Sequence, residues 1–153
     1  MMRLTIFLIF VLLGVNSNAQ KCFEFQKEHC QPAPSKFTYQ TNNNSAAYKF
    51  SAGELRRIPF GLMENKDYRI TLCGDSVFNG IILFVIQDES GKEIYNNSQH
   101  SFALNLEFSA KKSQEVNFDI TIPDNTNVPA DSLSVEGCVG ILIEEMSTIK
   151  TGF

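Results

Sequence analysis

The sequence predicts an all-β protein, an antiparallel two-sheet β-sandwich of jelly-roll-like type with about eight strands. Three observations lead to this prediction. Apolar and polar residues alternate along short segments, which is the periodicity of half-buried strands. Turn-forming residues separate these segments at intervals of about 8–12 residues. No convincing helical pattern follows residue 36. A closed β-barrel is the alternative architecture.

Residues 1–19 have the pattern of a cleaved signal peptide. Arg3 supplies the positive charge, residues 4–15 are almost entirely apolar, and we expect cleavage after Ala19. An uncleaved anchor is disfavoured because the apolar run is short for a membrane span, and a lipoprotein because Cys22 does not directly follow the cleavage site. The expected location is the periplasm, the cell surface or the secreted fraction, with no membrane span after cleavage.

The next segment, residues 20–36, is polar, and we expect a short helix or turn that a disulfide staples to the body. Phe23 and Phe25 are its apolar anchors, expected to pack on the sandwich. Pro32 and Pro34 predict an extended connector at its end.

From residue 37 onward the pattern is that of strands, and Asn42-Asn43-Asn44-Ser45 is expected to form a polar turn between the first two. Pro59 cannot donate to a sheet ladder and predicts an edge strand or a strand end. The apolar run 81–86 predicts a central strand that is covered on both faces, and Gly91 is the expected left-handed residue of a hairpin. The predicted strand segments are 37–41, 46–51, 54–60, 67–73, 81–86, 93–96, 101–108, 115–122 and 137–145.

Alternation also predicts which side chains face the core. Arg69, Thr71 and Cys73 are expected on the outward side of their strand. The inward residues are expected to be Tyr68, Ile70, Leu72, Phe102, Leu104, Leu106, Phe108, Val116, Phe118, Ile120 and Ile122.

The last apolar strand, residues 137–145, is expected to close the sandwich as a buried central strand beside 67–73. Gly140 within it is expected to allow a close approach of other atoms. The chain therefore divides into a signal peptide (1–19), a polar N-terminal segment (20–36), the sandwich (37–145) and a C-terminal tail (146–153).

All four cysteines lie beyond the signal peptide, which predicts two disulfides in an oxidising compartment. Of the three connectivities we favour Cys22–Cys30 with Cys73–Cys138. A straight helix over 22–30 would separate its ends by about 12 Å, so the first pairing requires a turn there. The spacing shows no zinc motif, and His29 is interpreted as a solvated loop histidine.

The formal net charge is −4, and it becomes −5 if Arg3 is removed with the signal peptide. The charges are scattered and form no basic run. Nucleic acid and anionic lipid surfaces are therefore poor partner candidates on electrostatic grounds.

Several motifs in the chain are typical of strands and disulfides rather than of a catalytic site. They are Asp67-Tyr68-Arg69-Ile70 with Cys73, Tyr95-Asn96-Asn97, Glu107-Phe108 and Gly137-Cys138-Val139-Gly140-Ile141-Leu142-Ile143. Together with the ending 148–153, they resemble a group of small exported proteins of Bacteroidetes-type bacteria that has no assigned activity. More coarsely, the strand pattern is similar to pre-peptidase C-terminal-like β-sandwich domains, which are accessory modules of secreted enzymes. Neither resemblance implies catalytic residues.

The sequence predicts no catalytic residue, no cofactor and no metal site. His29 and His100 are interpreted as polar loop residues, and no nucleophile elbow, zinc-protease or phosphate-loop motif occurs. Two carboxylate groupings have the chemistry for calcium but not its spacing, and are interpreted as solvated acids. They are Asp88, Glu89 and Glu93, and then Asp124, Asn125, Asp131 and Glu136.

The leading functional hypothesis is an exported, non-enzymatic accessory or binding protein of the bacterial cell envelope, with another envelope protein as its partner. The alternative is a glycan- or peptide-binding sandwich module, with calcium as an optional aid. The absence of Trp counts against glycan, because such sites generally use flat aromatic platforms. A small hydrolase or inhibitor is a third hypothesis supported only by secretion. The sequence assigns no ligand-binding residue.

Overall fold

A computed structural model describes residues 22–34, 38–124 and 135–148 of the chain, so the predicted signal peptide lies outside the described residues. Within these ranges the protein is nearly all β, as predicted, and no helix is long and apolar enough to cross a membrane. The elements are α2 (Phe25–His29), β1 (Gln40–Thr41), β2 (Ala46–Ser51), β3 (Leu55–Leu62), β4 (Lys66–Gly74), η1 (Ser76–Phe78), β5 (Leu83–Asp88), β6 (Glu93–Asn96), η2 (Asn97–His100), β7 (Asn105–Ser109), β8 (Gln114–Thr121) and β9 (Glu136–Ser147).

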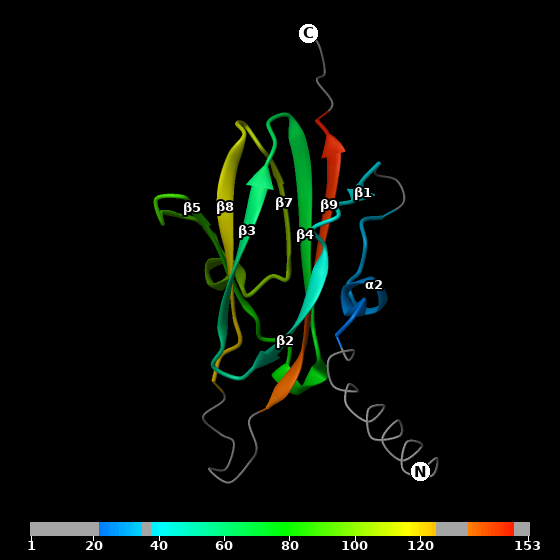
Figure 1. Ribbon diagram of the computed structural model, residues 1–153, viewed down its shortest axis with the longest axis vertical. Helices are drawn as coiled ribbons and strands as arrows, with labels where there is room; N and C mark the ends of the chain where they lie inside the picture. The colour runs from blue at the N-terminus through cyan, green and yellow to red at the C-terminus, as the bar shows by residue number, and fades with distance from the viewer. Residues whose placement is uncertain (1–21, 35–37, 125–134, 149–153) are drawn as a thin grey trace, which may run out of the picture.

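Eight of these strands form four nested antiparallel pairs: β2 with β9, β3 with β8, β4 with β7 and β5 with β6. Sheet A has the order β2-β9-β4-β7, with β1 pairing β9 beyond the end of β2, and sheet B has the order β3-β8-β5-β6. The nested pairs are those of one long hairpin rolled up into two facing sheets (Figure 1). This is a jelly roll, so the predicted architecture is confirmed.

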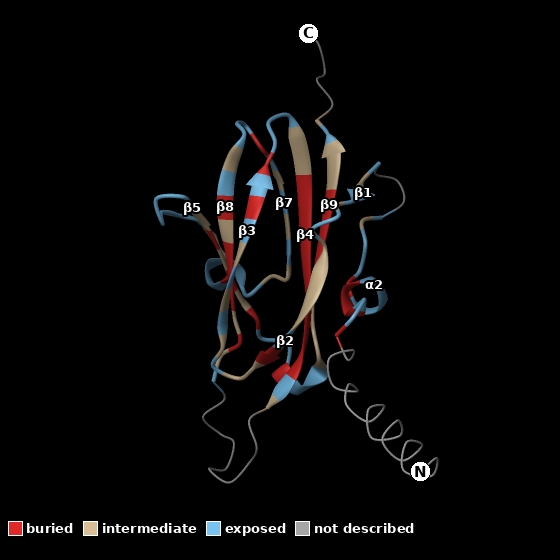
Figure 2. Cartoon of the chain, in the orientation of Figure 1, coloured by how far each residue is buried: buried red, intermediate tan, exposed pale blue. Residues whose placement is uncertain are grey.

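The core lies between the two sheets, where each strand places alternate side chains. Tyr68, Ile70 and Phe118 are no more than 1% exposed, and burying a side chain of this size contributes roughly 1.5–3 kcal/mol. Figure 2 shows how the buried residues run along the middle of the strands. The inward prediction is also confirmed for Leu72, Val116, Ile120 and Ile122, which are buried, and for Leu104, Leu106 and Phe108, which are partly buried against the same core.

The segment before β7 is a turn rather than the predicted strand, and Phe102 in it is 43% exposed with a left-handed φ of 56°. The turn is built around Asn97, whose side chain is fully buried. Its Nδ2 donates to the carbonyl of Ile82 at 2.8 Å, and its Oδ1 accepts from the amide of Phe84 at 2.9 Å. These contacts join segments that strand alternation does not relate to each other. They hold residues 101–104 in a turn although their apolar and polar residues alternate as in a strand.

β5 is a central strand of sheet B, between β8 and β6, as the apolar run predicts. The expectation that it is covered on both faces is wrong, because Phe84 and Ile86 are buried whereas Leu83 and Val85 are only half-buried. The described α-helix packs on sheet A instead, so no helix among the described residues covers the outer face of sheet B (Figure 1).

Two turn and edge predictions are confirmed. Pro59 lies in β3, which is one of the two edge strands of sheet B. Gly91 has a φ of 80° in the β5–β6 hairpin, a conformation that glycine adopts without steric cost.

Residues 22–34, called the strap below, cross the outer face of sheet A (Figure 1). Two disulfides fasten the strap, Cys22–Cys138 and Cys30–Cys73, so the predicted pairing is wrong although all four cysteines are bonded. β4 and β9 are neighbours, as predicted, but Cys73 lies opposite Gly140. Both strand cysteines point away from the core toward the strap, which therefore supplies the partner of each.

The strap buries polar groups that alternation places on an outward face. Arg69 and Thr71 do point away from the core, yet each is less than 9% exposed beneath the strap. Nη1 of Arg69 donates to Oε2 of Glu144 at 3.2 Å, and the amide of Ala33 donates to the same carboxylate at 2.9 Å. The strap thus completes the hydrogen bonding of a buried ion pair.

The Gly140→Ala substitution is expected to lower the free energy of unfolding by about 1–3 kcal/mol, the usual cost of overpacking. A Cβ at this position would lie 2.7 Å from Sγ of Cys73 and 2.8 Å from Cα of Gln26, so the strap would have to shift. Urea unfolding followed by circular dichroism measures the change. Gly61→Ala in β3 is the matched control, because a Cβ there meets nothing within 4 Å. Equal stability of the two variants would contradict close packing of the strap on β9.

Candidate functional site

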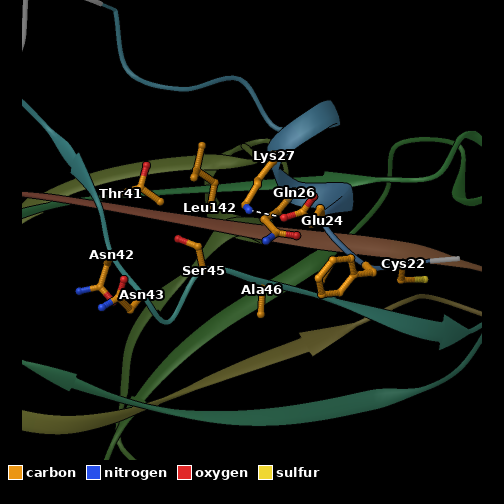
Figure 3. Close-up of a pocket in the computed structure, with 12 residues that line it drawn as sticks. Cys22, Glu24, Gln26, Lys27, Thr41, Asn42, Asn43, Ser45, Ala46 and Leu142 are labelled. Carbon is orange, nitrogen blue, oxygen red and sulfur yellow. Dashed lines mark hydrogen bonds and ion pairs between the residues drawn. The ribbon is translucent and has the colours of Figure 1, made fainter. Parts of the chain in front are cut away.

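A groove of about 430 Å³ runs between α2 of the strap and the turn that joins β1 to β2. Leu142 of β9 and Ala46 of β2 line it from the sheet (Figure 3). The side chains of α2 stand on one side, and Asn42 and Asn43 of the turn stand on the other. The groove is the place where three segments distant in sequence meet on the outer face of sheet A.

Local geometry explains why the strap presents one phenylalanine to solvent and buries the other. The helix begins after Glu24, which has a left-handed φ of 63°, and ends before Cys30, which is extended and bonded to Cys73. Phe25 packs beneath with the Cys22–Cys138 bridge. Phe23 lines the groove and is 79% exposed, so the expectation that it anchors the strap is wrong.

The opposite wall is a turn that β9 holds in place, which confirms the polar turn expected between the first two strands. Oδ1 of Asn42 accepts from the amide of Asn44 at 2.9 Å, and Nδ2 of Asn42 donates to Oε2 of Glu145 at 2.6 Å. Oγ of Ser45 donates to the carbonyl of Ile143 at 3.0 Å. These side chains are occupied within the protein, whereas Asn43 is exposed at the tip of the turn.

Gln26 is a buried polar residue in the lining of the groove. Its side chain is 7% exposed, and its buried Oε1 has no hydrogen-bond partner among the described residues. Oγ1 of Thr71, on the strand beside β9, is in the same situation. Leaving a buried polar group unpaired costs about 1–3 kcal/mol. A donor that reaches Oε1 of Gln26 would therefore gain a bond that no described residue supplies.

The charges near the groove are paired. Glu24 and Lys27 form an ion pair across one turn of α2, drawn as a dashed line in Figure 3. Farther along the same face, burial raises the pKa of Tyr39, and the carboxylates of Glu107 and Asp67 raise it further. The groove is thus close to neutral, and recognition there depends on shape and hydrogen bonds.

The two histidines lie apart from this groove. His29 is exposed and stacks on Phe25, with ring centroids 4.0 Å apart, and His100 stacks on Tyr95 at 5.2 Å. His29 was expected in a solvated loop, but it is the last residue of α2.

Two of the carboxylates considered as calcium ligands, Asp88 and Glu93, accept hydrogen bonds from nearby residues of the protein. Asp88 accepts hydrogen bonds from Ser90 and Lys92, and these bonds lower its pKa. Glu93 accepts from Asn96 at 3.1 Å. In the part of the chain that the structure describes, no group of three or more His, Cys, Asp or Glu residues is placed to hold a metal ion. Asn125 and Asp131 lie outside the described residues.

Sequence reasoning missed Phe23, Gln26 and Asn43 as groove residues. A phenylalanine is ordinarily predicted to lie in the core, and a glutamine or asparagine in a polar segment is predicted to lie on the solvated surface. The only signal was the polar turn after β1, and its position beside the strap depends on the disulfides.

No family model and no curated protein matches the chain. Among solved structures, the fold is similar to that of PliG from Aeromonas hydrophila, a periplasmic lysozyme inhibitor of g-type lysozyme. The TM-score is 0.50 at 7% sequence identity, and the match covers 75% of this chain and 93% of the PliG chain. At this identity the likeness shows a shared fold.

Proposed function

We propose that the chain is an exported, non-catalytic binding protein that holds an extended segment of a partner protein of the bacterial cell envelope in the groove beside the strap. The observation that carries the proposal is the exposed ring of Phe23 in the same groove as Gln26, whose buried Oε1 lacks a donor. A peptide supplies apolar side chains for the ring and N–H groups for the carbonyl. The two disulfides hold the strap in place before binding, which reduces the ordering cost.

The residues of the groove support binding rather than catalysis. Its charged side chains, Glu24 and Lys27, are paired with each other. All four cysteines are disulfide-bonded, so no thiolate nucleophile is present. The remaining lining is amide, hydroxyl and apolar, which is the composition of a recognition surface.

The shared fold suggests which partner to test first. PliG inhibits a g-type lysozyme, so a lysozyme of that type is the first candidate, and binding to it would also satisfy the hypothesis of a secreted inhibitor. An origin among exported Bacteroidetes-type proteins remains part of the proposal and rests on the sequence resemblance.

The Phe23→Ala substitution is expected to weaken partner binding at least tenfold, because exposed aromatic anchors dominate interfaces of this kind. The measurement is titration calorimetry, first with purified g-type lysozyme and then with any stoichiometric partner recovered from envelope extract. Phe102→Ala is the matched control, since Phe102 is an exposed phenylalanine outside the groove lining. Both substitutions should leave thermal stability unchanged.

Two results would overturn the proposal. One is the absence of any stoichiometric protein partner. The other is a partner that Phe23→Ala and Phe102→Ala affect equally. A glycan array screened with and without chelator covers the alternative: saturable glycan binding that Phe23→Ala abolishes would replace the protein partner by a sugar.

A further inference from the structure

The two long sides of the sandwich are closed to different extents. On the side where β2 faces β3, the guanidinium of Arg56 lies over the rings of Tyr48 and Phe50, at 5.2 and 4.9 Å from their centroids. The pocket that remains on this side has a volume of about 240 Å³. On the other side, the two edge strands are β6 of sheet B and β7 of sheet A. A groove of about 420 Å³ opens there, near the turn between β7 and β8.

The lining of this second groove is the core itself. Leu62, Ile86 and Ala110 are buried at its base, and Leu106 and Phe108 of β7 are half-buried beside them. Ile94 of the short strand β6 also lines the groove and is 51% exposed. The volume falls in the range of about 300–1,000 Å³ that is typical of small-molecule sites, which are likewise mainly apolar.

One rim of the groove is positive. Lys111 and Lys112, in the turn between β7 and β8, both line it and are exposed. Neither ammonium group makes an ion pair with any residue that the structure describes. An apolar trough with two free cations at one end matches a molecule with an alkyl chain and an anionic headgroup.

We propose that this groove binds a single-chain anionic amphiphile of the long-chain fatty acid class, with the alkyl chain on Leu106, Phe108 and Ile94 and the carboxylate at Lys111 and Lys112. The net charge of −4 works against binding to an extended anionic surface, so the occupant is one free molecule rather than a membrane. This site is separate from the groove beside the strap and does not depend on the proposed protein partner.

The test uses cis-parinaric acid, a fatty acid that becomes fluorescent in an apolar site, and competition by saturated acids of increasing length below their micelle concentrations. We expect saturable binding to the full exported chain, with the dissociation constant falling up to about fourfold for each methylene that the groove buries. The methyl ester of the best competitor should bind at least tenfold more weakly than the acid.

Matched variants separate the apolar and charged parts of the site. Ile94→Glu should weaken binding of the acid at least tenfold, whereas Leu55→Glu, at an exposed leucine on β3, should have no effect. The double variant Lys111→Glu/Lys112→Glu should bind the acid at least tenfold more weakly, whereas its affinity for the ester should be unchanged. Lys92→Glu, in the β5–β6 turn, is the control for an exposed lysine that does not line the groove. Thermal unfolding checks that each variant is folded.

Each of three outcomes would overturn the inference: no saturable binding of cis-parinaric acid, equal effects of Ile94→Glu and Leu55→Glu, or equal affinity for acid and ester. Flotation with vesicles of neutral and anionic phospholipid distinguishes the source of the ligand. Binding to anionic vesicles without binding of monomeric acid would assign the lysines to a membrane surface and exclude the free molecule.

Discussion

Replacing both cysteines of the Cys22–Cys138 bridge by alanine is expected to lower the free energy of unfolding by about 4–5 kcal/mol. The bridge spans 116 residues, and in the chain-entropy model the stabilisation from a cross-link grows with the length of the loop it closes. The bridge also fastens the start of the strap, where Phe25 packs beside it. Urea unfolding followed by circular dichroism gives the free energy directly.

The Cys30→Ala/Cys73→Ala variant is the matched comparison, with an expected loss of about 4 kcal/mol because its bridge spans 43 residues. Counting thiols in denaturant tests the pairing itself. Cys22→Ala/Cys138→Ala should leave no free thiol, whereas Cys22→Ala/Cys30→Ala should leave two. The reverse result would restore the pairing that the spacing of the sequence favours.

Substituting Glu144 by leucine is expected to lower the free energy of unfolding by about 3–5 kcal/mol, because it leaves the buried guanidinium of Arg69 without its main counterion. The side chains of this pair are only 10% and 6% exposed. The same change leaves the amide of Ala33 without its acceptor. Glu107 lies 3.3 Å from Nε of Arg69 and is more than half exposed. Because it remains as a second counterion, the loss of unfolding free energy should be nearer about 3 than 5 kcal/mol.

Two further variants make this result specific to burial. Glu136→Leu, on the same strand, breaks an exposed pair with Lys49 and should cost no more than about 1 kcal/mol. The double variant Arg69→Met/Glu144→Leu should recover much of the loss, since an apolar pair of similar volume often replaces a buried ion pair at no net cost. A double variant as unstable as the sum of the single changes would show that the ion pair is not what holds the strap.

Local pattern determined most of the fold. Period-two alternation placed Tyr68, Ile70 and Phe118 in the core because a strand turns every second side chain to the same face. The turn residues before Gly91 predicted its positive φ, and the absence of a backbone N–H at Pro59 predicted that β3 lies at an edge. These rules act within a few residues, so they can be read without knowing what lies across the sheet.

The candidate site was only partly accessible in this way. The polar turn at Asn42 was expected and is present, but nothing local distinguishes Phe23, which is exposed, from Phe25, which is buried two residues later. Their exposure depends on where the strap lies, and that depends on which strand cysteine each strap cysteine reaches.

The sequence by itself therefore determined an all-β sandwich whose last apolar strand, β9, lies buried beside β4. Only the tertiary structure decided what covers the outer face of that pair. Alternation correctly assigned Cys73, Arg69 and Thr71 to the side of the sheet that faces away from the core. On that side, however, these residues lie beneath the strap rather than in solvent. The physical reason is that strand periodicity reports which side a residue takes, while burial on that side is set by segments far away in the chain.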